Sequence, residues 1–199
     1  MVLRSKRLEQ PGKLSGRHGN LMIEELRAAT RQLHERLEAR FDAIQLLSDR
    51  AIRPETMRRY ASFHVPADTV LSRALGHIPE LEMHRRTRGH LLSPHVRGWA
   101  WIDFPEPAGE ADALGMAYVV EGTSLGGNVI LKRLRDKGAD CPEFAFLHPY
   151  GADTGLMWKR FLSAASARIG TDPEAREMAC RGAISAFRHA ERVLCGDAA

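Results

Sequence analysis

Residues 121–130 read EGTSLGGNVI and place three glycines, Gly122, Gly126 and Gly127, within six positions. The flanking segments ALGMAYVV and ILKRLRDK have the composition of a helix, so the glycines are expected in a helix interior. A glycine there costs roughly 0.5–1 kcal/mol relative to alanine. Three glycines in a helix interior therefore indicate that something must pack against backbone without side chains, and the identity of that neighbour decides the place of this helix in the fold.

The glycines of this helix share one face. At about 100° per residue, Gly115, Gly122 and Gly126 fall within about 40° of one another on a helix over residues 109–136. A neighbouring helix could pack closely on such a face of small residues. A planar ligand could equally lie on it, with the Gly126–Gly127 pair letting the helix bend around the ligand. The spacing alone leaves both occupants open.

Composition limits the class of protein. The chain has 199 residues, of which 44% are hydrophobic and 27% charged, which predicts one globular domain with a sizeable core. No apolar run reaches the ~18–20 residues of a membrane span, and the N-terminus has no secretory apolar segment. Three cysteines without CxxC spacing favour reduced thiols and a cytoplasmic location.

Charge gives a weaker signal about partners. The formal net charge is +4 and the basic residues are spread along the chain, which argues against a nucleic-acid partner. A mildly basic surface suits an anionic small molecule or an acidic protein partner. The hypothesis of a helical DNA-binding protein would depend only on the basic residues near the N-terminus.

Periodicity predicts an all-α protein of six to eight helices in one domain. Residues 1–20 are expected to form a mobile basic leader, and Pro66 is expected to kink or break its helix. We find no lasting strand alternation and no internal repeat. The expected helices span 21–41, 53–78, 109–136, 155–169 and 172–195, with a short segment over 81–99 and a loop over 137–154.

The first long helix carries two residues of chemical interest. His34 lies about 60° from the centre of its apolar face, and Arg27, seven residues earlier, lies about 20° from His34 on the wheel and about 10.5 Å along the axis. An imidazole and a cation at this separation suit a ligand with a metal centre and peripheral carboxylates, such as haem with its propionates. A packing role for His34 and a solvated charge at Arg27 are the alternatives.

Two segments resemble the motifs of heme oxygenases. LRAATRQLHERLE (26–38) resembles their proximal helix, and YVVEGTSLGGNVI (118–130) resembles their distal helix. PYGADTGLMWKRFL (149–162) is similar to a segment of bacterial members, especially those that accompany bacteriophytochromes. The resemblance covers about residues 21–195. It implies a single helical heme oxygenase-like domain over 21–199, with haem between the proximal helix and a kinked distal helix.

The resemblance also implies roles for individual residues. His34 becomes the iron ligand and Arg27 a propionate contact, while Gly122, Gly126 and Gly127 form the part of the distal helix that bends over the haem. Tyr118 would contact a propionate or pack against the haem edge, and Lys159 or Arg160 would supply further cations to the propionates. Glu38 lies near the proximal region, although a surface charge is the alternative.

One position departs from the family pattern. Mammalian-type members have an aspartate directly after the first distal glycine, where it anchors water beside bound oxygen, and this chain has Thr123 there. Phytochrome-associated members also lack that aspartate. The water would then be held by backbone carbonyls, by Thr123 or by another polar group. Asn128 is one candidate, with a surface amide as the alternative.

The implied reaction is the oxidative opening of haem to biliverdin, carbon monoxide and ferrous iron. It uses O2 and electrons from a donor such as a ferredoxin or a flavoprotein reductase, and haem is both substrate and cofactor. A photoreceptor is an expected acceptor of the biliverdin. The alternatives are a haem carrier or sensor without turnover, and a related helical enzyme without haem, such as a thiamin-degrading one.

Overall fold

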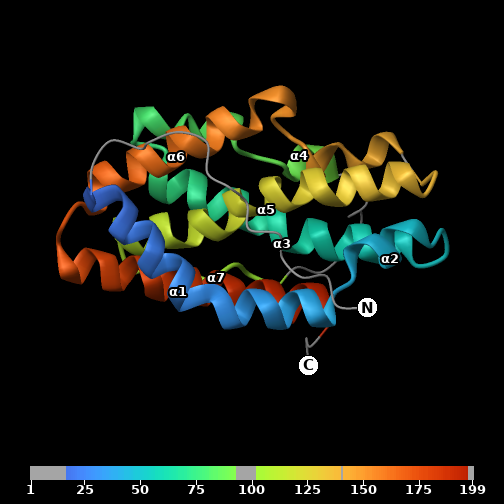
Figure 1. The fold of residues 1–199 in the computed structure, drawn as a ribbon, viewed down its shortest axis with the longest axis horizontal. Coiled ribbons are helices and arrows are strands. Elements are labelled where there is room, and N and C mark those ends of the chain that lie inside the picture. Colours follow the sequence, from blue (N-terminus) through green and yellow to red (C-terminus); the bar gives the residue numbers. More distant parts are fainter. Residues whose placement is uncertain (1–16, 93–101, 140, 197–199) are drawn as a thin grey trace.

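The computed structural model describes residues 17–92, 102–139 and 141–196, and within these ranges the chain is helical without any strand (Figure 1). This confirms the predicted all-α class. The described residues form seven α-helices: α1 (Arg17–Arg40), α2 (Ala43–Ser48), α3 (Arg53–Leu75), α4 (Gly89–Leu92), α5 (Glu110–Asp136), α6 (Thr154–Ile169) and α7 (Pro173–Cys195). Short 3-10 helices are η1 (Pro79–Leu81), η2 (Met83–Arg85), η4 (Pro142–Leu147) and η5 (Gly151–Asp153).

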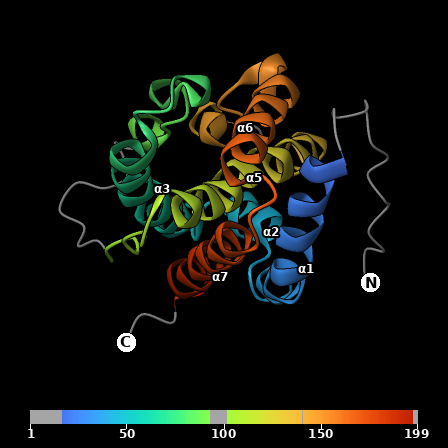
Figure 2. The ribbon, with the colours of Figure 1, turned by 90° about the vertical axis from the view of Figure 1, so that its left-hand side faces the viewer.

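Helix α5 lies at the centre and packs against α3, α6 and α7, which surround it in Figures 1 and 2. Its residues 113–120 are all apolar and mostly buried, as expected for a helix covered on several sides. Helix α1 packs mainly on α7 and α6. The core between these helices includes four phenylalanines that are almost inaccessible to solvent: Phe63, Phe144, Phe146 and Phe161.

Local sequence signals explain several helix ends. The Asp172 carboxylate accepts a hydrogen bond from the Glu174 N–H at 3.0 Å, and Pro173 occupies the first turn of α7. Gly196 ends the same helix with φ of 80°, a left-handed conformation that glycine adopts without strain. The predicted helix over 172–195 is therefore confirmed, with its start set by the TDPE sequence.

Three boundaries differ from the sequence prediction. Helix α1 begins at Arg17, four residues before the expected helix start at residue 21, and residues 1–16 lie outside the described ranges. Of the two outcomes expected at Pro66, a kink or a break, the break does not occur, because α3 continues through this residue. Proline removes one backbone donor, but Phe63, Ala67 and Val70 around it are buried and keep both halves packed. Part of the predicted loop over 137–154 forms 3-10 turns.

Candidate functional site

The glycines of α5 fall into two groups. A Cβ added to Gly115 would lie 1.8 Å from the Ala179 carbonyl oxygen, and one added to Gly127 would lie 2.0 Å from the carbonyl oxygen of Leu147. These two glycines permit close backbone packing. A Cβ on Gly122 or Gly126 would meet no neighbouring atom of the described residues within 4 Å. Close packing therefore accounts for Gly115 and Gly127, whereas Gly122 and Gly126 present bare backbone to open space, which the planar-ligand explanation requires.

A contact between Arg27 and Tyr118 shows which side of α1 faces α5. Burial raises the pKa of the Tyr118 hydroxyl, while the positive charge of Arg27 and its hydrogen bond to that hydroxyl oppose the rise. The Tyr118 ring also packs against Trp158 of α6, with centroids 5.5 Å apart. Since Arg27 lies only about 20° from His34 on the helical wheel, the side of α1 that carries His34 is turned toward α5.

The open glycines lie on the same side of α5 as Tyr118. Gly122 and Gly126 follow Tyr118 by about 40° and 80° around the helix and by about 6 Å and 12 Å along it. Both α1 and α5 run from left to right in Figure 1. His34 lies about 10.5 Å beyond Arg27. The imidazole and the bare backbone are therefore at a similar level along two facing helices.

His34 is accessible and supported from two sides. Its side chain is 58% exposed, and its Nδ1 lies 3.6 Å from Glu38 Oε2, a distance too long for a strong hydrogen bond. Its ring meets the Phe187 ring of α7 edge-on, with centroids 5.9 Å apart. Because Glu38 lies on the Nδ1 side, Nε2 is the ring nitrogen left for a metal.

A buried ion-pair network involves the residues on either side of Gly122 in α5. Glu121 immediately precedes the first open glycine, and Arg86 donates to its Oε2 with both side chains at most 4% exposed. The Tyr150 hydroxyl donates to both Glu121 oxygens, at 2.8 and 3.0 Å. Burial and the Glu121 charge raise the pKa of Tyr150, so its hydroxyl stays protonated and remains a donor.

Thr123 belongs to the same network through Arg88, whose side chain is 1% exposed. Arg88 Nη1 donates to the Thr123 hydroxyl, which in turn donates to the Val120 carbonyl oxygen at 2.7 Å. Arg88 Nη2 donates to Ser124 Oγ at 2.6 Å, and the buried Nε has no hydrogen-bond partner among the described residues. At the position where the resemblance expects an aspartate, the chain thus has a hydroxyl held by a buried guanidinium.

Sequence reasoning missed Glu121, Arg86 and Arg88. Glu121 had a signal, because it is the one carboxylate in the apolar run LGMAYVVEG (114–122) and a buried carboxylate requires a partner. The two arginines had none, since they lie 35 residues before the groups that they contact.

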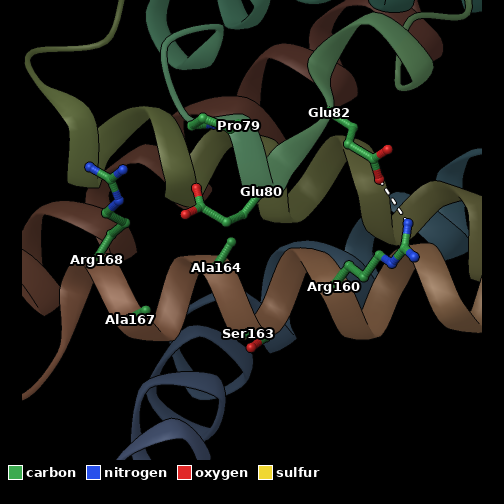
Figure 3. Close-up of a pocket in the computed structure, with 8 residues that line it drawn as sticks. All are labelled: Pro79, Glu80, Glu82, Arg160, Ser163, Ala164, Ala167 and Arg168. Carbon is green, nitrogen blue, oxygen red and sulfur yellow. Dashed lines mark hydrogen bonds and ion pairs between the residues drawn. The ribbon is translucent and has the colours of Figure 1, made fainter.

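The remaining predicted residues lie in different surroundings. Arg160 Nη1 donates to Glu82 Oε2 at 2.8 Å in a groove of about 580 Å³ between α6 and η1 (Figure 3), so the structure does not bring it to the other predicted residues. Lys159 is exposed on α6, one residue after the Trp158 ring that meets Tyr118. The Asn128 side-chain oxygen is hydrogen-bonded to His148 Nδ1.

Two findings concern metals and membranes. No group of three or more His, Cys, Asp or Glu side chains in the described ranges is arranged to hold a metal ion. A lone exposed imidazole suits instead a metal that brings its other ligands, as haem iron does. Within those ranges no helix is both long and apolar enough to cross a bilayer.

Comparison with known proteins gives no match to a protein-family model. The chain is similar to a heme oxygenase of Xanthomonas campestris pv. campestris (strain 8004), with 31% identity over 94 residues, or 47% of this chain. The match spans 56% of that relative, little more than half its length.

A solved structure extends the likeness to almost the whole chain. The NO- and CO-bound heme oxygenase from Neisseria meningitidis superposes with a TM-score of 0.68, covering 88% of this chain and 92% of the other at 20% identity. At that identity the likeness establishes the fold. The chain therefore has the helical fold of a bacterial heme oxygenase.

Proposed function

We propose that this protein is a heme oxygenase that opens haem to biliverdin, carbon monoxide and ferrous iron with O2 and external electrons. One observation carries the proposal: the bare backbone of Gly122 and Gly126 faces open space at the level of His34. A flat ring fits against backbone without side chains, and an imidazole opposite it suits an iron ligand. The similarity to two heme oxygenases supports the same conclusion.

The residues of the chain have simple tasks in this reaction. Bound haem would supply the iron at which O2 is reduced and the ring that is oxidised. His34 would hold the metal through Nε2. The bare backbone of Gly122 and Gly126 would form the facing wall of the site and confine a small molecule there. Gly127 contributes indirectly, because its packing against Leu147 holds this part of α5 in place.

Cations beside the site would orient the ring. Arg27 already meets Tyr118 at the edge of the gap, which makes this pair our choice for one propionate. Lys159 remains a candidate for the other, whereas Arg160 is engaged by Glu82. The placement of these cations sets the rotation of the ring in its plane and hence the carbon that is attacked.

Thr123 and Arg88 would take the place of the family's aspartate. The Thr123 hydroxyl gives its proton to the Val120 carbonyl and accepts from Arg88, so it presents one remaining lone pair to an incoming proton donor. The buried Nε–H of Arg88 has no acceptor among the described residues and suits an ordered water. Together they can hold water by one acceptor and one donor.

Several finer assignments belong to the proposal. The net charge of +4 is compatible with an acidic ferredoxin or a flavoprotein reductase as electron donor. The 149–162 segment supports the bacteriophytochrome-associated type, with a photoreceptor accepting the biliverdin, and the three cysteines support a cytoplasmic location.

An optical titration with haem, followed by a reductant and air, tests the proposal. We expect a Soret band to form and then to be replaced by the spectrum of biliverdin. His34→Ala should change the ferric spectrum, whereas His77→Ala, a control with the same 58% side-chain exposure, should not. A persistent Soret band in air would favour a haem carrier or sensor. Failure to bind haem at micromolar concentration would refute both and favour a helical enzyme without haem.

A further inference from the structure

We propose that Glu191 of α7 is a positioning residue that sets the rotation and register of α1, and thereby the direction in which His34 faces α5. The inference rests on the proposed role of His34. It concerns a carboxylate that lies outside the candidate site and touches neither His34 nor the open glycines.

Glu191 joins α7 to two arginines of α1. Its Oε1 accepts from Arg36 Nε at 2.6 Å and from Arg40 Nη1 at 2.8 Å, and its Oε2 accepts from Arg36 Nη2. The Arg36 contact is therefore bidentate, the most directional geometry available to this pair. The Glu191 side chain is only 11% exposed, so water competes poorly for these bonds.

The position of the two arginines on α1 allows this contact to fix the rotation of α1 about its own axis. The face of α1 that carries Leu33 and Leu37 packs against the core. On the wheel, His34 lies at one edge of that face, and Arg36 and Arg40 lie at the other. Glu191 holds the arginine edge, so a rotation of α1 that moved His34 would break the bonds to Glu191.

The edge of α1 that carries His34 packs against the same part of α7. Phe187, which meets the His34 ring, is one turn before Glu191 on α7. At the other end of α1, Arg176 donates to Glu25 at 3.1 Å. These contacts pair residues in increasing order along both helices, so α1 and α7 run parallel, as the adjacent blue and red helices of Figure 1 show. Ion pairs join the two helices near both ends.

Helix α7 is also the element that fixes α5. A Cβ on Gly182 would lie 2.0 Å from the Asp112 carbonyl oxygen, and one on Gly115 would lie 1.8 Å from that of Ala179. The two backbones are thus in direct contact. Since α1 packs mainly on α7 and α6, the separation between His34 and the open glycines depends on α7, and of the two ionic links that the described residues form between α1 and α7, the one at Glu191 is the nearer to His34 along α1.

The test compares Glu191→Gln with Glu177→Gln. Glu177 is a carboxylate on the same helix whose ion pair among the described residues is with Arg181 of that helix, at 3.5 Å, so its variant matches the change of charge without removing a bond to α1. Hydrogen exchange of the α1 amides is measured first, without haem. We expect exchange about tenfold faster than wild type in Glu191→Gln and unchanged exchange in the control.

The haem complexes are measured next. We expect a broadened or shifted iron–histidine stretching band and a Kd for haem raised about threefold or more in Glu191→Gln, again without change in the control. Unchanged exchange and an unchanged band in Glu191→Gln would overturn the inference. Haem binding that fails in the wild type would instead refute the proposed function, because the exchange measurement does not involve haem. If Glu191→Gln does not fold, Arg36→Gln, at a half-exposed residue, provides the same comparison.

Discussion

Two adjacent glycines of α5 should respond oppositely to the same substitution. Gly126 is open to space that would receive a Cβ freely, whereas a Cβ on Gly127 would lie 2.0 Å from the Leu147 carbonyl oxygen. Replacing each in turn by alanine adds one methyl group to the same helix, one residue apart. The pair therefore separates the cost of glycine in a helix from the need for close packing.

The expected magnitudes follow from these distances. Gly126→Ala should stabilise the haem-free protein by about 0.8–1 kcal/mol, the helix-propensity difference, and raise Tm by about 2–4 °C for a chain of this size. Gly127→Ala gains the same helix-propensity difference. Its methyl group must also displace the backbone at Leu147 by roughly 1 Å, and overpacking of this kind typically costs ~1–3 kcal/mol, with a larger cost where backbone must move. We expect a net loss of about 1–2 kcal/mol and a lower Tm.

Thermal unfolding and urea unfolding of both haem-free variants measure these differences. A third variant, Gly126→Leu, connects the result to function, because leucine is also a good helix former but projects into the space proposed for the ring. It should fold with at least wild-type stability and bind haem about tenfold more weakly or worse, which corresponds to about 1.4 kcal/mol.

Equal destabilisation by Gly126→Ala and Gly127→Ala would refute the division of the glycines into open and packed positions. Full haem affinity and full turnover in a stably folded Gly126→Leu protein would refute the use of bare backbone as one wall of the site, even if the stabilities behaved as expected.

Two further predictions concern buried polar groups. Thr123→Val leaves Arg88 Nη1 without its acceptor and should lower the free energy of unfolding in urea by about 1–3 kcal/mol, whereas Thr123→Ser should not; equal stability of the two variants would contradict this. His189 is 3% exposed and its Nε2 has no hydrogen-bond partner among the described residues, and burial, aided by Arg192, lowers its pKa to about 4. The unfolded chain therefore binds the proton first, so stability should fall as pH decreases from about 6.5 to about 4 and level off below. His64, also buried, acts in the same direction; an unchanged pH slope of urea midpoints in His189→Leu would be inconsistent with this assignment.

The helices and their faces were predictable because helix formation depends on neighbours within a few residues. The predicted spans 109–136, 155–169 and 172–195 agree with α5, α6 and α7 to within one residue at each end. Their periodicity and end signals are local. The common stripe of Arg27 and His34 follows equally from helix geometry alone. The break considered at Pro66 does not occur because packing around it, which is not local, outweighs one lost hydrogen bond.

Tertiary structure decided what each face meets. The sequence by itself determined that α5 carries a glycine stripe and that α1 carries an imidazole and a cation on one side. It could not distinguish the packed Gly115 and Gly127 from the open Gly122 and Gly126, because that difference depends on backbone from α7 and η4. The partners of Thr123 and Arg36 lie 35 and 155 residues away along the chain. Such contacts depend on how helices pack, since a helical pattern specifies which side is buried but not which distant residue will be there.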